Sequence, residues 1–316
     1  MDPYLSIVIP IYNEEENIPA LWERLSRVMK EHFSDPAKPW EIIFTDDGSR
    51  DRSLVMLLDL ARTEPRVKVV EFNRNYGQHS AIFGAFAEVR GQVVVTLDAD
   101  LQNPPEEIPK LVAKTEEGYD VVGGWRQGRQ DNDSFFRTMP SKIVNAITRK
   151  TTGVVLHDYG CMLRAYSRDV VDAMLLCKER SSFIPALANS FAKRITEVPV
   201  AHAERAAGTS KYGLWKLINL QFDLLTSFSL LPLQMLSVFG VITAALGFLL
   251  FLGLVVYRFM HPEGTAQGVF TLFAILFFFV GCQFIAFGLL GEYIGRIYQE
   301  VRDRPRYMVK KVHQAK

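Results

Sequence analysis

The strongest constraint on this 316-residue chain is a pair of long segments without a charged side chain. Residues 224–257 and residues 264–291 contain no Asp, Glu, Lys or Arg. A helix of about 20 residues spans the roughly 30 Å hydrocarbon core of a bilayer. The two segments therefore predict two transmembrane helices, at about 232–257 and 269–290 of the region 231–292. Two helices buried in a soluble core are the alternative.

The flanking residues predict the orientation of these helices. Basic residues follow the second segment, at Arg296, Arg302, Arg304, Arg306, Lys310, Lys311 and Lys316. Positively charged flanks stay in the cytoplasm, so residues 293–316 are predicted to be a basic cytoplasmic tail. Two spans then place residues 1–212 on the same side, and the short apolar run that opens the sequence lacks the features of a secretory signal.

Residues 213–230 precede the first of these segments and have an amphipathic pattern. Leu214, Leu217, Ile218, Leu225 and Phe228 fall on one helical stripe. This stripe predicts a helix that lies in the membrane interface. A helix that faces the core of the soluble domain is the alternative.

The first 120 or so residues alternate between two apolar patterns. Short runs rich in β-branched residues predict strands at 5–11, 41–45, 67–72, 92–98 and 119–124. Apolar residues recur at helical spacing between the first three of these runs. The alternation predicts an α/β domain over 1–212, with a mostly parallel, Rossmann-like sheet covered by helices on both faces.

Composition excludes two other classes of protein. Apolar residues make up 48% of the chain, which argues against a disordered chain. The 36 Lys and Arg residues nearly balance the 35 Asp and Glu residues, for a net charge of +1. A protein that binds nucleic acid through bulk positive charge would be far more basic.

Polar residues follow the first four predicted strands. The strand ends carry Glu14, Asp46 and Asp47, Asn73, and finally Asp98 and Asp100. Each alone is typical of a turn or a helix cap. Because the carboxyl ends of parallel strands meet at one edge, where ligands bind, the four ends together predict a ligand site.

The absent motifs limit what this ligand site can be. The sequence lacks the glycine-rich GxxxxGK[ST] loop and has no GxGxxG after its first strand. A bound diphosphate then needs another means of charge neutralisation. Asp98 and Asp100, with Gln102 two residues further on, supply oxygen ligands that suit Mg²⁺ or Mn²⁺.

The strand-end motifs resemble those of a known family. PxYNE at 10–14, DDGS at 46–49, and DAD at 98–100 with Gln102 two residues later are similar to motifs of the family-2 glycosyltransferases of GT-A fold. With two following spans, the chain resembles the polyprenyl-phosphate glycosyltransferases. The likeness is most specific in the blocks 73–82, 98–114, 158–166, 183–189 and 291–298.

The resemblance implies an inverting transfer from a UDP-sugar donor to undecaprenyl phosphate at the inner membrane. It assigns the metal and donor diphosphate to Asp98, Asp100 and Gln102, and places Asp158 where the family has a candidate catalytic base. A segment with Arg205 and Lys211 would close over the phosphates. Uracil and ribose would contact Pro10, Tyr12, Glu14 and Asp46. The resemblance also implies a homotetramer.

The acceptor's chemistry argues against a full base role for Asp158. A phosphate monoester has a second pKa of about 6 and is mostly dianionic at neutral pH. The acceptor is then nucleophilic without losing a proton. We therefore expect Asp158 to position a basic residue or the acceptor, and to act as a base only in part.

Basic residues close to the predicted membrane surface are candidates for binding the acceptor phosphate. They are Arg126, Arg129, Arg137 and Arg205. Arginine can bind two phosphate oxygens at once. Attraction to anionic lipid headgroups is the competing interpretation.

The resembling blocks favour 4-deoxy-4-formamido-L-arabinose as the sugar, and lipid A modification with polymyxin resistance as the role. UDP-glucose or UDP-N-acetylglucosamine is the alternative donor. An inactive, membrane-anchored binding protein is the alternative of another class, although Asp98, Asp100 and Gln102 are all present. A small transporter is disfavoured because the predicted spans hold few polar side chains.

Overall fold

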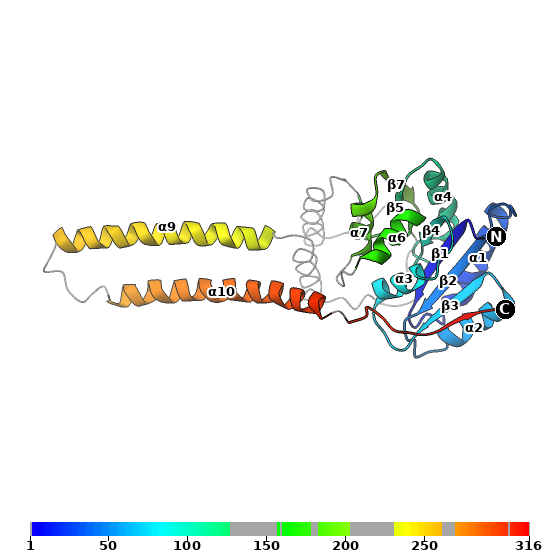
Figure 1. Ribbon diagram of the computed structural model, residues 1–316, viewed down its shortest axis with the longest axis horizontal. Helices are drawn as coiled ribbons and strands as arrows, with labels where there is room; N and C mark the ends of the chain where they lie inside the picture. The colour runs from blue at the N-terminus through cyan, green and yellow to red at the C-terminus, as the bar shows by residue number, and fades with distance from the viewer. Residues whose placement is uncertain are drawn as a thin grey trace. The chain divides into compact units, whose positions relative to one another are not determined.

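A mixed sheet of eight strands forms the centre of the first of two structural units (Figure 1). The computed structural model describes residues 2–126, 157–158, 160–177, 183–202, 231–260, 269–302 and 304–315. The strand order is β7-β5-β6-β4-β1-β2-β3-β8. The strands are β1 (Leu5–Ile11), β2 (Trp40–Asp46), β3 (Val67–Phe72), β4 (Val93–Thr96), β5 (Val121–Arg126), β6 (Arg164–Ser167), β7 (Ile195–Val200) and β8 (Val309–Gln314).

The parallel part of the sheet confirms the predicted α/β arrangement. Strand β1 pairs in parallel with β2 and β4, and β2 pairs in parallel with β3. Strand β6 runs antiparallel to both β4 and β5, and β7 returns parallel to β5. The carboxyl ends of β1, β2, β3 and β4 therefore lie along one edge of the sheet.

Helices cover both faces of the sheet, as the apolar periodicity predicts. Ile7 and Ile9 of β1 belong to a core shared with Leu25 of α1, whereas Val8 belongs to a second core with Phe86 of α3. Alternate side chains of a strand thus enter opposite cores. The helices of this unit are α1 (Ile18–His32), α2 (Ser53–Thr63), α3 (Gln78–Phe86), η1 (Pro105–Glu107), α4 (Ile108–Glu116), α6 (Arg168–Leu176) and α7 (Ile184–Phe191).

Residues from the predicted basic tail contribute an edge strand to this unit. The first unit comprises Met1–Ile218 and Arg304–Lys316, and β8 pairs antiparallel with β3. Tyr307 stacks on Phe72 with ring centroids 4.9 Å apart. Glu71 accepts hydrogen bonds from Lys310 Nζ at 2.6 Å and from the His313 ring at 2.9 Å. Part of the segment predicted to be a basic cytoplasmic tail is therefore a strand of the sheet.

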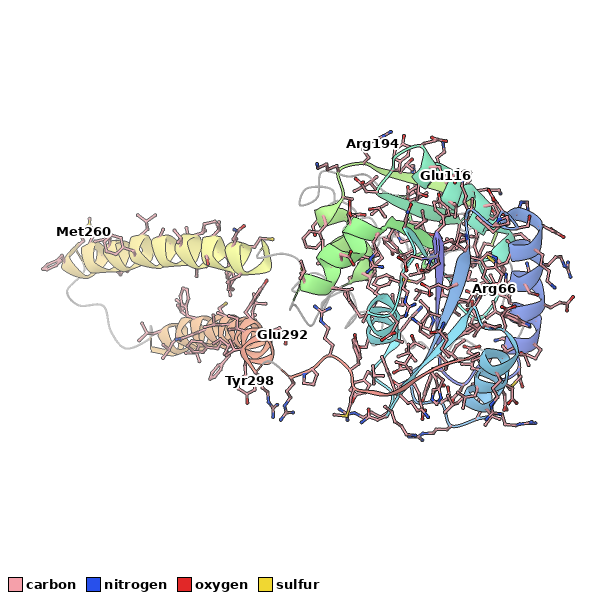
Figure 2. All side chains as sticks on the ribbon, turned by 45° about the vertical axis from the view of Figure 1, so that its right-hand side comes forward. Arg66, Glu116, Arg194, Met260, Glu292 and Tyr298 are labelled. Atoms are coloured by element: carbon pink, nitrogen blue, oxygen red, sulfur yellow. The ribbon has the colours of Figure 1, made fainter. Side chains whose placement is uncertain are left out.

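The second unit, Asn219–Asp303, contains two long helices, α9 (Leu231–Met260) and α10 (Val269–Val301). Met260 ends α9, and Glu292 and Tyr298 lie on the last turns of α10 (Figure 2). Both helices expose large apolar side chains, among them Phe239, Leu249 and Phe284. Among the residues that the structure describes, no helix meets the length and apolarity required to cross a membrane.

Candidate active site

The ends of β1 and β2 bring the first two predicted strand-end motifs together. Ile11 and Asp46 are register partners at the ends of these strands. Two residues after Ile11, Asn13 has a φ of 56°, and its backbone N–H donates to Ser49 Oγ at 3.1 Å. Tyr12 is 42% exposed beside this turn. The two loops thus form one continuous surface at the sheet edge.

The two adjacent aspartates of the second motif differ in their hydrogen bonds. Asp47 accepts from the backbone N–H of Tyr76 at 2.7 Å and of Gly77 at 2.8 Å, so both of its oxygens hold the neighbouring loop. Asp46 is 1% exposed and accepts from Ser49 N–H through Oδ2, while its buried Oδ1 has no hydrogen-bond partner among the residues that the structure describes. Burial raises the pKa of Asp46. A buried acceptor without a partner calls for an explanation, and a bound ligand is one candidate.

The fourth motif follows β4 and carries the predicted metal ligands. Asp98 Oδ1 accepts from Gln78 Nε2, at the start of α3, at 2.6 Å. Asp100 Oδ1 accepts from the backbone N–H of Gln102 at 3.2 Å, across a turn in which Leu101 has a φ of 60°. A positive φ is strained for a branched residue such as leucine. This turn keeps Asp100 and Gln102 adjacent.

The electrostatics of this motif suit a divalent cation. Burial, together with the charge of Asp100, raises the pKa of Asp98 to about 7, and Glu14 adds to the shift. Carboxylates brought together in this way repel one another, and a bound cation would relieve the repulsion. The described residues contain no cluster of three or more His, Cys, Asp or Glu side chains able to hold a metal. The donor set expected from the sequence, the carboxylates of Asp98 and Asp100 with the Gln102 amide, stays a prediction.

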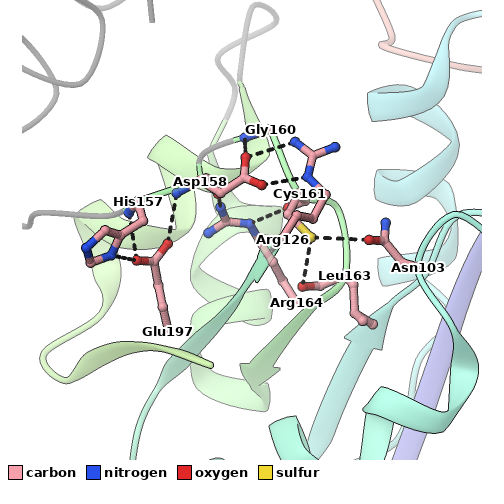
Figure 3. A network of polar contacts seen from close by, with 9 residues as sticks. All are labelled: Asn103, Arg126, His157, Asp158, Gly160, Cys161, Leu163, Arg164 and Glu197. Atoms are coloured by element: carbon pink, nitrogen blue, oxygen red, sulfur yellow. Dashed lines mark hydrogen bonds and ion pairs between the residues drawn. The ribbon is translucent and has the colours of Figure 1, made fainter. Parts of the chain in front are cut away.

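Asp158 pairs with Arg126, the last residue of β5. Arg126 donates from Nε to Asp158 Oδ2 at 2.6 Å and from Nη2 to Oδ1 at 2.9 Å (Figure 3). Both side chains are nearly buried, with 12% and 10% exposed. The expectation that Asp158 contacts a basic residue agrees with this two-point ion pair, which also raises the pKa of Arg126 although burial opposes the shift.

The same arginine links the cationic and acidic parts of the site. The charge of Arg126 lowers the pKa of Asp98, against the larger effect of burial. The charge of Asp98 in turn raises the pKa of Arg126. The carboxylates of the fourth motif and the Arg126–Asp158 pair therefore belong to one electrostatic site, although they come from distant parts of the sequence.

Two residues that the sequence interpretation missed contact the main chain of Asp158. Glu197 of β7 accepts the Asp158 N–H at 3.2 Å, and Arg164 of β6 donates to the Asp158 carbonyl at 2.9 Å (Figure 3). Arg164 stands in the block 158–166 that resembles the family, which was the only available signal. Glu197 lies in no such block.

The neighbouring Cys161 is buried and links this segment to the fourth motif. Its thiol lies 3.6 Å from Oδ1 of Asn103. Burial raises the pKa of this thiol to about 11, so it stays protonated at neutral pH. Cys161 is thus a packing residue.

Four predicted site residues lie outside the described part of the chain. Arg129 and Arg137 follow β5 within residues 127–156, and Arg205 and Lys211 fall within residues 203–230. The predicted interfacial helix at 213–230 lies outside it as well. Their roles stay predictions.

The parallel strands and the acidic loops at their carboxyl ends place the candidate site at one edge of an α/β sheet. Residues 6–175 match the family described as "Glycosyl transferase family 2". The chain belongs to glycosyl transferase family 2.

Curated relatives are similar over nearly the whole chain. The undecaprenyl-phosphate 4-deoxy-4-formamido-L-arabinose transferase of Proteus mirabilis is 56% identical over 310 residues, covering 98% of this chain and 93% of that protein. A protein of the same name from Edwardsiella ictaluri is 53% identical over 314 residues, covering 99% of this chain and 95% of that protein.

A solved structure is similar in fold. The mannosyl-3-phosphoglycerate synthase from Rubrobacter xylanophilus has a TM-score of 0.50 and 14% sequence identity, and the match covers 71% of this chain and 72% of that chain. At this identity the likeness concerns the fold alone, and it supports the predicted GT-A type of α/β domain.

Proposed function

We propose that this protein transfers 4-deoxy-4-formamido-L-arabinose from a UDP donor to undecaprenyl phosphate, with inversion at the anomeric carbon. The names of relatives more than 50% identical over the whole chain support the substrates. The observation that carries the proposal is one site in which Asp98, beside Asp100, interacts electrostatically with the nearly buried Arg126. In such a site a cation held by the carboxylates would bind the donor diphosphate, and the arginine would bind the acceptor phosphate close to it.

The donor would bind along the ends of β1, β2 and β4. The orphaned Asp46 Oδ1 would accept a hydrogen bond from the ribose or the base. The exposed ring of Tyr12, with Pro10 and Glu14 beside it, would contact uracil. Asp98, Asp100 and Gln102 would hold Mg²⁺ or Mn²⁺. When bound, the ion would neutralise the charge of the leaving diphosphate.

The acceptor phosphate would bind at Arg126. Asp158 would fix the orientation of the Arg126 guanidinium. A phosphate dianion can attack the anomeric carbon without a base. Its oxygen forms the new C–O bond as the bond to UDP breaks, and attack from the face opposite UDP inverts the configuration. Asp158 is engaged by Arg126 through both oxygens, which supports a positioning role. Arg129, Arg137, Arg205 and Lys211 would add further phosphate contacts.

We further propose that the two charge-free segments, residues 224–257 and residues 264–291, cross the inner membrane, with the catalytic unit and both termini in the cytoplasm. The charge-free runs at 224–257 and 264–291 and the exposed apolar side chains of both helices support this proposal. The helix predicted at 213–230 would lie in the membrane interface. We propose a homotetramer as the assembly.

The test of the function uses purified protein, undecaprenyl phosphate and a panel of UDP-sugars, each with and without a chelator. We expect transfer from the formamido-arabinose donor, loss of turnover with the chelator, and recovery with Mg²⁺ or Mn²⁺. Transfer only from UDP-glucose or UDP-N-acetylglucosamine would contradict the proposed formamido-arabinose donor. Turnover that resists the chelator would contradict the proposed dependence on a divalent metal ion. UDP binding without any transfer would favour the alternative of an inactive binding protein.

A further inference from the structure

A glycine in β5 lies between two long polar side chains of the neighbouring strands. Gly123 is the register partner of Arg164 on β6 and of Glu197 on β7. A Cβ atom at Gly123 would lie 3.3 Å from Nη1 of Arg164 and 3.4 Å from Cγ of Glu197. The first distance is shorter than most packing contacts, and the second is a close but ordinary contact. Because Gly123 has no side chain, the long side chains of Arg164 and Glu197 fit on either side of it in the sheet.

Both side chains reach the main chain of Asp158. Glu197 accepts the N–H of His157 at 2.7 Å through Oε2 and the N–H of Asp158 at 3.2 Å through Oε1. Arg164 donates from Nη2 to the carbonyl of Asp158 at 2.9 Å and from Nε to the carbonyl of Cys161 at 2.9 Å. Figure 3 shows the two side chains approaching this segment from either side.

Burial makes these contacts effective. Arg164 is fully buried and the Glu197 side chain is 8% exposed. Charged groups at such positions lose their hydration and depend on protein hydrogen bonds. Glu197 also contacts the His157 ring, which stacks on Trp125 of β5 at 4.6 Å. An apolar residue at position 197 would pair in β7 equally well and would avoid the cost of burying a charge. We therefore attribute the Glu197 carboxylate to its hydrogen bonds with His157 and Asp158.

We propose that Arg164 and Glu197 are positioning residues that clamp the main chain of Asp158 from both sides. The clamp fixes where the Asp158 carboxylate meets Arg126, and so where the Arg126 guanidinium faces the reacting phosphate. The inference rests on the proposed function, since it assigns Arg126 to that phosphate. A misplacement of about 1 Å at a reacting group costs up to about 100-fold in rate.

The test combines Glu197→Gln with Asp158→Ala in a double-mutant cycle. Glutamine keeps the size of the side chain, but only one of its two terminal atoms can accept an N–H. We expect kcat to fall about 10- to 100-fold in Glu197→Gln, with the donor KM and the affinity for UDP with Mn²⁺ unchanged. In the Asp158→Ala background, Glu197→Gln should cause no further loss, because it acts through Asp158. Glu23→Gln, which alters an exposed pair with Arg27, is the matched control.

A second variant and a second readout keep the test decisive. Gly123→Ala retains every polar group and crowds both members of the clamp, so we expect a several-fold loss of kcat even if Glu197→Gln folds poorly. Hydrogen–deuterium exchange should rise in residues 157–161 of both variants. Losses that add in the double mutant, or exchange and kcat equal to wild type in both variants, would overturn the clamp. Wild-type protein that transfers no sugar would overturn the proposed function, while the exchange data would still test the clamp.

Discussion

Ionisation of the Asp98 carboxyl group destabilises the folded state of the metal-free protein. Its pKa is about 7 in the folded chain, against about 3.9 for an unperturbed aspartate. Between these pH values the folded state holds more protons than the unfolded state, so the free energy of unfolding falls as pH rises from about 4 to about 7. The carboxylate is thus maintained for function at a cost in stability.

Replacing this charge should therefore stabilise the metal-free protein while abolishing its activity. With a chelator present, we expect Asp98→Asn to melt several degrees above wild type at pH 8, with a smaller difference at pH 5. Thermal unfolding at the two pH values measures this effect. Asp59→Asn, at an exposed pair with Arg62, should show no such pH dependence. A variant that melts below wild type at pH 8 would contradict the assignment.

The Arg126–Asp158 pair depends on the shape of the guanidinium as well as on its charge. Lysine keeps the charge but cannot make two parallel hydrogen bonds to a carboxylate. We therefore expect Arg126→Lys to lower kcat about 10- to 100-fold in steady-state transfer assays. Arg27→Lys, at a surface pair with Glu23, is the control. Wild-type rates in Arg126→Lys would show that charge alone suffices.

The sequence identifies the acidic half of the site because parallel strands bring their ends to one edge. Asp46, Asp98 and Asp100 could be selected on that ground alone. The separation of roles between Asp46 and Asp47 could not, because it depends on which oxygens meet backbone N–H groups. Glu197 escapes prediction because its contact with Asp158 exists only through the pairing of β7 with β5.

At the scale of elements, Tyr307 packs the segment before β8 against the rest of the first structural unit. Its ring stacks on Phe72, and its hydroxyl donates to the Phe83 carbonyl at 3.3 Å. We expect Tyr307→Ala to destabilise the unit by about 1–3 kcal/mol, or several degrees in Tm. Lys311→Ala, on an exposed position of β8, should change Tm little. Equal melting of the two variants would contradict this role for the segment.

The first three strands and two helices are predictable because apolar periodicity is strong there. Strands β1 and β3 match the expected positions to the residue. Strand β8 is not predictable in this way. Its sequence, VKKVHQ, is polar and mostly exposed, and it becomes a strand only because β3 offers an unpaired edge.

For the whole molecule, the proposed topology makes a prediction about both ends of the chain. With two spans, both termini face the cytoplasm. A green fluorescent protein fused after residue 316 should fluoresce, and alkaline phosphatase at the same place should be inactive. Alkaline phosphatase inserted between the proposed spans, within residues 261–268, should be active. The opposite pattern would reverse the topology, and cytoplasmic signals at both places would exclude two spans.

The pairing of β3 with β8 affects the order in which the protein is completed during synthesis. Strand β3 ends at Phe72, whereas β8 begins at Val309, after both helices of the second unit. At about 5–20 residues per second, a ribosome needs on the order of 10–50 seconds to make the intervening chain. During that time the backbone groups along one side of β3 remain available to other polypeptides. A nascent chain stalled within α9 or α10 would carry this open edge, to which a strand of another chain can pair.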